Sequence, residues 1–338
     1  MVRILVVLRA SLRDTFLNEH AKGLLAELAP THFEFFDDAA GRRMDEAAYI
    51  ALLQRLQPEI VVTAWQSPQF TPAVQKACPS VKYICHLCGT LKAITTAEAI
   101  RNGVLVSNWG DVIARTIAEA TLMMMLAGLR RVAAFQHLLH EEKGWAHDGI
   151  ACASLFERRV GLYGMGPIAM KTVELLKPFG CKISGFSRHA PHAQFVENDI
   201  HPAHSLEALF EHSQVLSIHT GWNKETEKSV TADLLRRLPD GALVVNTARG
   251  QIVDEPALAA ELKTGRIFAA LDVFSEEPLP ADSPLRGLPN CLLMPHVAGP
   301  TPDRLPDLGA HCVRQLATYL RGGKPLYTVS AEQYERAT

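Results

Sequence analysis

The sequence lacks any hydrophobic run long enough to cross a membrane. Its longest apolar helix candidate, Leu122–Leu129, is far shorter than the roughly 20 residues that span a bilayer. The first ten residues hold a short apolar run broken by arginines and no cleavage-site pattern, so we interpret them as a buried strand and not as a signal peptide. We therefore expect no association with a membrane.

The sequence also has little net charge and few cysteines. Its 34 basic and 36 acidic residues give a net charge of −2, and no basic patch of the kind that binds nucleic acid stands out. The seven cysteines are odd in number and scattered, which predicts reduced thiols and a cytoplasmic location. We expect no nucleic-acid partner and no disulfide framework.

Nothing in the sequence predicts a metal site. Cys85 and Cys88 form a lone CxxC pair, and a zinc site would need two further ligands at a suitable spacing. Ordinary packing is the favoured interpretation of these thiols. The histidines between residues 189 and 204 fall in a polar stretch and are interpreted as solvated loop residues.

What the sequence does contain is a regular alternation of strand-like and helical segments. With 338 residues, 48% of them apolar, the chain is long enough for about two domains. Alternation of this type is typical of parallel sheets with helices on both faces. The strands expected in the first part are Arg3–Leu8, His32–Phe36, Glu59–Thr63, Val81–Cys85 and Val104–Val106, with a helix at Met44–Leu56.

A long apolar helix is expected next, over Asp111–Glu142, with Asp111 as its N-cap. Its apolar surface must be buried by its own domain or by a partner subunit. The alternation then resumes with a helix at Glu255–Lys263 that Asp254 can cap, and it ends in a helix at Pro306–Leu320. The strands expected in this part are Val160–Tyr163, Cys181–Phe186, Val215–His219, Ala242–Asn246, Phe268–Asp272 and Cys291–Met294.

A glycine motif between a strand and a helix predicts a dinucleotide site. Gly164 permits a tight turn, Gly166 lets the backbone approach a pyrophosphate, and Ala169 is small enough for close helix–strand packing. The helix that follows would offer free N–H groups to the phosphates. The strand before, the helix after and a second strand about 20 residues on make this motif more specific than the glycines alone.

The end of that second strand indicates which nicotinamide cofactor binds. An NAD site usually has an acidic residue there, whereas this sequence has Ser187 followed by Arg188. A hydroxyl and a guanidinium suit a 2′-phosphate, so NADP is the preferred cofactor and NAD the second choice. The alternative is that Arg188 is a solvated turn residue.

Three further strand ends carry residues suited to hydride transfer chemistry: Arg249, then Asp272 and Glu277, then His296. A ketone that accepts a hydride needs a proton for its oxygen, and histidine can donate and recover one near neutral pH. A carboxylate beside the histidine would fix the ring and stabilise its charged form. A guanidinium can bind a substrate carboxylate and polarise the adjacent carbonyl.

The motifs NTARG, DVFxxEP and PHVAG, in this order, resemble those of the D-isomer-specific 2-hydroxyacid dehydrogenases. The resemblance implies that Arg249 binds the substrate carboxylate and carbonyl, that His296 is the acid/base, and that Glu277 is its partner. It places Asp272 near the nicotinamide carboxamide, and Cys88 and Gly89 in a substrate loop whose backbone N–H groups hold the carboxylate. Glu277, where formate dehydrogenases have glutamine, argues against that related activity. The cofactor-binding residues expected are Gly164, Met165, Gly166, Pro167, Ile168, Ser187, Arg188, Thr220, Ala248 and Asp272.

The same resemblance implies two Rossmann-like or flavodoxin-like domains, with the reaction in the cleft between them. Residues 1–107 and 299–338 would form the substrate domain, and residues 108–298 the inserted cofactor domain. The long helix would be the arm of a homodimer, and the substrate a small 2-keto or 2-hydroxy acid, with glyoxylate and hydroxypyruvate as the first candidates.

The sequence departs from the family pattern in two segments. The loop reads HLCGTLK where a G-V-D pattern is common, which leaves the identity of the substrate open. The segment HTGWNKET lacks a usual proline, and Gly221 in its place is expected to loosen a cofactor contact. The rival hypothesis is a nucleotide-sensing, corepressor-like binding protein of the same fold, which could keep the same three residues. Turnover of reduced cofactor with 2-keto acids distinguishes the two.

Overall fold

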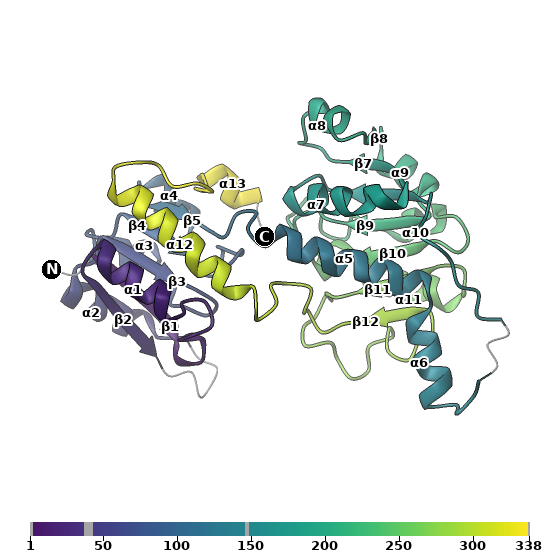
Figure 1. Ribbon diagram of the computed structural model, residues 1–338, viewed down its shortest axis with the longest axis horizontal. Helices are drawn as coiled ribbons and strands as arrows, with labels where there is room; N and C mark the ends of the chain where they lie inside the picture. Colours follow the sequence, from purple (N-terminus) through teal and green to yellow (C-terminus); the bar gives the residue numbers. More distant parts are fainter. Residues whose placement is uncertain (1–2, 37–42, 146–148, 337–338) are drawn as a thin grey trace. The chain divides into compact units, whose positions relative to one another are not determined.

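The structure, a computed structural model, describes residues 3–36, 43–145 and 149–336. The chain divides into two compact units: unit 1, residues 1–113 and 301–338, and unit 2, residues 114–300. Each unit is built on a parallel sheet flanked by helices (Figure 1), so the predicted α/β fold class is confirmed. The domain boundaries expected from the sequence were 107/108 and 298/299.

Unit 1 has a five-stranded parallel sheet in the order β2-β1-β3-β4-β5. Helices α1 and α12 pack together on one face, and α2, α3 and α4 bury the other face with strand residues such as Val7 and Val61. The strands are β1 (Ile4–Arg9), β2 (Thr31–Phe36), β3 (Ile60–Thr63), β4 (Tyr83–His86) and β5 (Leu105–Ser107). The helices are α1 (Glu19–Leu28), α2 (Glu46–Leu56), α3 (Pro72–Ala77), α4 (Ala97–Arg101), α12 (Leu305–Leu320), α13 (Ala331–Arg336) and the 3₁₀ turn η1 (Ala10–Leu12).

Unit 2 has a seven-stranded parallel sheet in the order β12-β11-β10-β9-β6-β7-β8. The direction of strand progression reverses between β6 and β9, the kind of point where ligands bind in open α/β sheets. The strands are β6 (Arg159–Tyr163), β7 (Lys182–Phe186), β8 (His201–Pro202), β9 (Val215–Ile218), β10 (Leu243–Asn246), β11 (Phe268–Leu271) and β12 (Cys291–Leu293). The helices are α5 (Ala114–Leu129), α6 (Val132–His140), α7 (Pro167–Leu176), α8 (His192–Glu197), α9 (Leu206–His212), α10 (Ala232–Arg237) and α11 (Glu255–Lys263), with 3₁₀ turns η2 (Lys177–Phe179) and η3 (Gly250–Ile252).

The sheet of unit 2 is buried on both faces because its strand residues alternate between two cores. Leu243 and Val245 of β10 pack with α5 and α7, which lie side by side in Figure 1. Val244, between them, packs with α9, α10 and α11. Asp254 caps α11 by accepting from the Ala257 amide, as predicted from the sequence.

The predicted helix over Asp111–Glu142 is wrong, because the segment forms two helices. Arg131 adopts a left-handed conformation with φ of 55° and separates α5 from α6. Its guanidinium donates to the carbonyl oxygens of Gly128 at 3.0 Å and Ala151 at 3.2 Å, and covers the ring of Phe268. These contacts hold the break in place.

The predicted N-cap role of Asp111 is also wrong. Helix α5 begins at Ala114, and the Asp111 carboxylate instead accepts a hydrogen bond from the hydroxyl of Tyr327. Much of the apolar surface of α5 is buried in its own unit, since Met124 and Met125 are fully buried there. Among the described residues, no helix is both long and apolar enough to span a membrane.

Candidate active site

The chemistry-bearing residues predicted for unit 2 follow the carboxyl ends of six of its strands. Gly164 follows β6, Ser187 follows β7 and Thr220 lies shortly after β9. Arg249 lies beyond β10, and the residues after β11 and β12 include Asp272 and His296. Because all six strands are parallel, their carboxyl ends lie along the same edge of the sheet.

The turn between β6 and α7 has the shape that a dinucleotide requires. Gly164 has a φ of +101°, and a Cβ there would lie 2.4 Å from the backbone nitrogen of Thr220. Gly166 is the N-cap of α7, and a Cβ there would meet nothing within 4 Å. The space beside the first turn of α7 is thus open, and any larger residue at Gly166 would fill it. Pro167, which has no N–H of its own, begins that first turn, and the backbone N–H groups that follow it at the helix N-terminus suit a pyrophosphate.

Met165 has a structural role within the same turn. Its side chain is buried against Gly185 of β7, where an added Cβ would lie 2.6 Å from the sulfur. Its carbonyl oxygen accepts from Nε2 of Gln194 at 2.7 Å. A glycine in β7 therefore lets the strand pass close to the glycine turn.

The end of β7 places Ser187 and Arg188 on the surface of unit 2. The Ser187 hydroxyl oxygen accepts from the amides of His189 and Ala190, at 3.4 and 3.3 Å. Nη1 of Arg188 donates to Oε2 of Glu225 at 2.7 Å, from a side chain that is 49% exposed. Sequence reasoning missed Glu225, since a contact between two loops leaves no local pattern.

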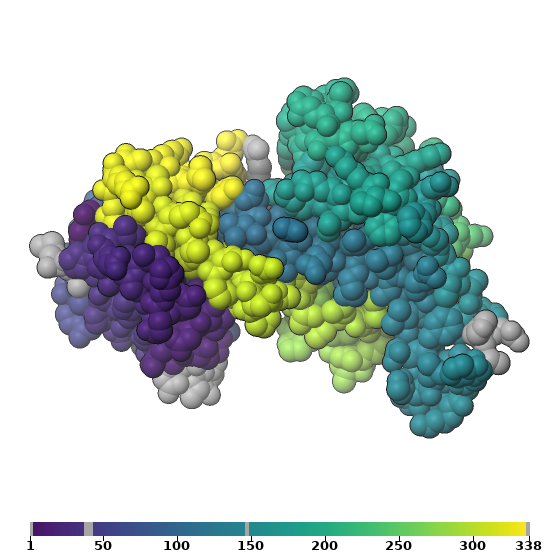
Figure 2. Space-filling model, in the orientation of Figure 1, coloured from purple at the N-terminus to yellow at the C-terminus, as the bar shows by residue number. Residues whose placement is uncertain are grey.

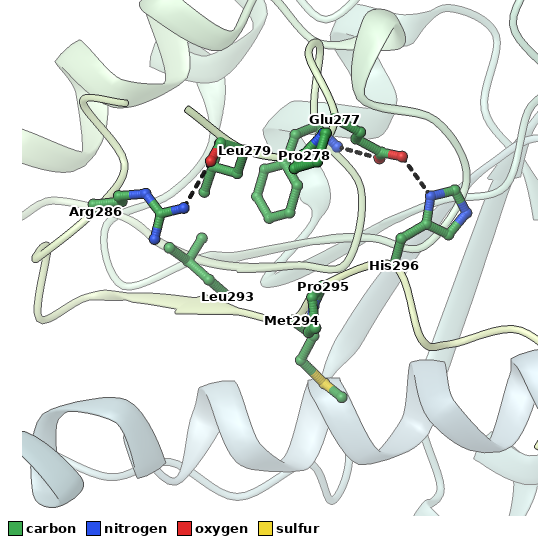
Figure 3. Close-up of a pocket in the computed structure, with 9 residues that line it drawn as sticks. Glu277, Pro278, Leu279, Arg286, Leu293, Met294, Pro295 and His296 are labelled. Carbon is green, nitrogen blue, oxygen red and sulfur yellow. Dashed lines mark hydrogen bonds and ion pairs between the residues drawn. The ribbon is translucent and has the colours of Figure 1, made fainter. Parts of the chain in front are cut away.

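His296 and Glu277 form a close pair (Figure 3). Nδ1 of His296 lies 2.6 Å from Oε2 of Glu277, while Oε1 of Glu277 accepts from the amide of Phe274 at 3.0 Å. Both Glu277 oxygens are therefore engaged, and the contact at Nδ1 makes Nε2 the ring nitrogen that can exchange a proton with a substrate. The structure brings together these two predicted residues.

The backbone at His296 is strained and firmly held. Its φ of 55° lies in the left-handed region, which costs a non-glycine residue on the order of 1–3 kcal/mol. Its amide donates to the carbonyl oxygen of Asp272 at 2.8 Å. The Asp272 carboxylate accepts from the amides of Val297 at 2.8 Å and Ala298 at 2.9 Å. Asp272 therefore anchors the loop that carries His296.

Asp272 is buried beneath the loop that it anchors. The residue is 1% exposed, and burial raises the pKa of its carboxyl group, against the lowering effect of the two amide hydrogen bonds. The resemblance assigned Asp272 a contact with the nicotinamide carboxamide. Its two oxygens face the loop of His296, so its described contacts are structural.

Arg249 is presented by a turn that packs tightly against the loop of Glu277. Its Nη1 donates to the carbonyl oxygen of Ala248 at 2.6 Å, and Asn246 bonds both to the Ala248 amide and to the Arg249 carbonyl. A Cβ on Gly250 would lie 1.9 Å from the carbonyl carbon of Phe274, so only glycine fits there. Burial lowers the pKa of Arg249, and the charge of Glu277 opposes that shift. The turn of Arg249 and the loop of Glu277 therefore meet at Gly250 and Phe274.

A cavity of about 580 Å³ adjoins the His296–Glu277 pair (Figure 3). Its wall is mainly apolar, and Arg286 secures one side by donating to the carbonyl oxygens of Leu279 and Pro280, both at 2.7 Å. The lining residues are Phe274, Glu277, Pro278, Leu279, Arg286, Leu293, Met294, Pro295 and His296. The cavity therefore presents an apolar surface beside the acid/base pair.

In unit 1, the predicted substrate loop at Cys88 and Gly89 is braced by two residues that sequence reasoning missed. Nδ2 of Asn108 donates to the Gly89 carbonyl at 2.8 Å, and a Cβ on Gly89 would meet the Trp109 ring at 2.6 Å. Cys88 is 1% exposed and burial raises its pKa far above the usual value, so only the backbone there suits a ligand. Cys85 lies against Cys312, with 3.5 Å between the sulfurs.

Comparison with known proteins identifies the kind of protein that has these features. Residues 122–298 match the family described as D-isomer specific 2-hydroxyacid dehydrogenase, NAD binding domain. A glyoxylate reductase of Aeropyrum pernix is 31% identical over 262 residues, which cover 75% of this chain and 78% of that protein. A glyoxylate reductase of Thermofilum pendens is 29% identical over 293 residues, 83% of this chain and 84% of that protein.

A solved structure has the same fold over nearly the whole chain. The glyoxylate reductase of Paecilomyes thermophila superposes with a TM-score of 0.81 and 20% sequence identity, covering 98% of this chain and 99% of that one. At this identity the likeness concerns the fold alone.

Proposed function

The chain belongs to the D-isomer specific 2-hydroxyacid dehydrogenases, which are NAD(P)-dependent oxidoreductases, and from this premise we propose that it reduces a small 2-keto acid through His296, Glu277 and Arg249. The observation that carries the proposal is the 2.6 Å contact between Nδ1 of His296 and Oε2 of Glu277. It leaves Nε2 for the substrate and holds the ring in one orientation. Arg249, whose turn packs through Gly250 on Phe274 in the loop of Glu277, completes the set.

Each residue has a distinct task in the proposed reaction. The nicotinamide cofactor, when bound, supplies the hydride. His296 gives the Nε2 proton to the carbonyl oxygen of the keto acid and takes it back when the 2-hydroxy acid is oxidised. Glu277 stabilises the charged ring. Arg249 binds the substrate carboxylate with its planar pair of donors and polarises the carbonyl.

The proposed cofactor site lies along the glycine turn and the end of β7. The pyrophosphate would lie against the backbone of Gly164, Met165, Gly166, Pro167 and Ile168, and the open space beside Gly166 supports this. The donors would be the amides of Met165, Gly166 and Ile168, since Pro167 has no N–H and the Gly164 amide donates to the Phe186 carbonyl oxygen. Thr220 and Ala248 line the same edge of the sheet. We propose NADP over NAD, because Ser187 and Arg188 stand where an NAD-selective site has an acid.

For the substrate we propose glyoxylate or hydroxypyruvate. Relatives from Aeropyrum pernix and Thermotoga maritima carry the names glyoxylate reductase and hydroxypyruvate reductase. In unit 1, the backbone N–H groups at Cys88 and Gly89 are proposed to hold the carboxylate, with Asn108 keeping that loop in shape.

The experiment that tests this function follows oxidation of NADPH and NADH with glyoxylate, hydroxypyruvate and pyruvate. We expect turnover with at least one of the first two acids. If every acid gives only the background rate while the reduced cofactors bind, the proposed reaction with these acids is wrong and the result favours the nucleotide-sensing alternative.

We also propose a cytoplasmic homodimer in which α6 contacts a second copy. The helix buries none of its residues in its own protomer, although it is largely apolar. Val132, Leu139 and, just beyond it, Trp145 are 39%, 42% and 85% exposed, and in Figure 2 this segment projects from unit 2. Sedimentation at micromolar concentration tests this, and a compact monomer would contradict it. The seven free cysteines suit a reducing compartment.

A further inference from the structure

Two loops of unit 2 are joined by one ion pair at the place proposed for the cofactor ribose. Arg188 follows β7, and Glu225 lies in the loop after β9, on the other side of the intervening strand β6. Nη1 of Arg188 donates to Oε2 of Glu225 at 2.7 Å. The guanidinium that makes the site suitable for a 2′-phosphate therefore already has an anionic partner.

The position of Glu225 is set by the loop itself and not by Arg188 alone. Oδ1 of Asn223 accepts from the amides of Glu225 at 2.8 Å and Thr226 at 3.2 Å. The Thr226 hydroxyl donates to the carbonyl oxygen of Gly221 at 2.7 Å and closes the turn. The backbone under Glu225 is thus fixed, whereas its side chain is 62% exposed and can move away from Arg188.

We propose that Glu225 is a specificity-determining residue, whose carboxylate competes with the 2′-phosphate of NADP for Arg188. In NAD-selective sites the opposing carboxylate stands at the end of the second strand, where this chain has Ser187. Here the carboxylate comes from the loop after β9 instead. The competition limits the preference for NADPH and leaves NADH a usable cofactor. The inference rests on the proposed binding of NAD(P) at this edge.

The exposure of the pair determines how large the effect is. An exposed ion pair is weak, so a phosphate that carries more charge than a carboxylate can displace Glu225 from Arg188. Removing the carboxylate leaves Arg188 free for the phosphate and also removes a nearby negative charge. We expect NADPH to bind about threefold to tenfold more tightly to Glu225→Gln than to the native protein.

The matched control is Glu227→Gln, because Glu227 is an exposed acid in the same loop and its loss changes the net charge equally. Dissociation constants for NADPH, NADH, adenosine 2′,5′-bisphosphate and AMP would be measured by calorimetry at fixed ionic strength. We expect Glu225→Gln to tighten only the two ligands that carry a 2′-phosphate. Glu227→Gln should change all four constants by less than about twofold.

A double variant tests whether Glu225 acts through Arg188. In an Arg188→Ala background, Glu225→Gln should tighten adenosine 2′,5′-bisphosphate less than it does with Arg188 present. An equal gain in both backgrounds, no gain in Glu225→Gln, or equal changes for NADPH and NADH would each overturn the inference. If the native protein binds none of the four ligands, the proposed cofactor site fails instead.

Discussion

In unit 2 the carboxyl ends of the strands lie along one edge of the sheet, and the two ends of this edge are built differently. At one end, beyond β10, β11 and β12, the backbone is fixed by buried contacts: Asp272 bonds three successive residues from 296 to 298, and Gly250 packs on the backbone of Phe274. At the other end, beyond β7, Arg188 is held by one exposed ion pair. We name these the acid/base end and the ribose end.

Exposure of the side chains does not distinguish the two ends. The His296 side chain is 48% exposed and that of Arg188 is 49% exposed. What differs is the support beneath them, because His296 stands on a strained backbone that a buried carboxylate holds. A proton must be delivered to one atom of the substrate, whereas a phosphate can be bound by a charge with some freedom. Proton transfer therefore needs the fixed backbone at the acid/base end, whereas selection of the cofactor can use the less supported side chain at the ribose end.

Of the changes at the acid/base end, replacement of His296 should lower the catalytic rate the most. His296→Ala should lower kcat by about 10² to 10⁴, since the general acid is lost, and leave the dissociation constant of NADPH nearly unchanged. Steady-state rates with glyoxylate and a direct binding titration check both halves. His204→Ala, an exposed histidine of the same unit, is the control. Activity of His296→Ala within a few-fold of the native value would remove His296 from the mechanism.

Arg249→Lys should be the next most harmful change, although it keeps the charge. Lysine cannot present the planar fork that binds a carboxylate and polarises a carbonyl, so we expect kcat/KM for the keto acid to fall by about 10². Arg237→Lys, in a surface ion pair with Glu211, is the control. A change confined to the KM of the cofactor would make Arg249 a cofactor ligand.

Asp272→Asn tests whether the anchor beneath His296 matters. Asparagine has one oxygen to offer where the carboxylate accepts two amides, so one buried N–H loses its partner, at a cost of about 1–3 kcal/mol in the free energy of unfolding. We expect kcat to fall about tenfold as His296 shifts. Asp254→Asn, which exchanges one good helix cap for another, should do neither. Full activity in a destabilised Asp272→Asn would separate the anchor from catalysis.

Arg188→Ala should have the smallest effect, and the quantity that changes should be the affinity for the cofactor. It removes the cation for the 2′-phosphate, so the dissociation constant of NADPH should rise about fivefold to tenfold, and that of NADH by less than about twofold. Isothermal titration with both cofactors measures this. Equal weakening of both would mean that Arg188 supports the loop and does not select the cofactor.

The position of the residues at the acid/base end could be predicted from the sequence because its signals are local, while their catalytic roles stay predictions. Arg249, Glu277 and His296 each follow a recognisable apolar strand, and parallel strands bring their ends to one edge. The cap of α11 at Asp254 depends on residues three apart and was predicted for the same reason. The bounds of the predicted strands differ from those in the structure by at most two residues, and the short strand β8 was not predicted.

Features that depend on distant partners were not predictable. Asp111 has a capping sequence, but Tyr327, 216 residues away, takes its carboxylate. Arg131 interrupts the long helix because its guanidinium contacts the ring of Phe268 and the carbonyl oxygen of Ala151. Glu225 reaches Arg188 across 37 residues, and no pattern within either loop indicates the contact. For Asp111 and Arg131, tertiary contacts override a local preference.

We assign proton transfer to the acid/base end and cofactor selection to the ribose end. The rate of hydride transfer in a single turnover tests this assignment most directly. Native protein, His296→Ala and Arg188→Ala would be saturated with NADPH or NADH and mixed with saturating glyoxylate, while the loss of reduced cofactor is followed by stopped-flow absorbance. We expect His296→Ala to slow the transfer by about 10² or more with either cofactor. Arg188→Ala should transfer hydride at the native rate with both. A comparable slowing in Arg188→Ala at saturation, or a native rate in His296→Ala, would contradict the account.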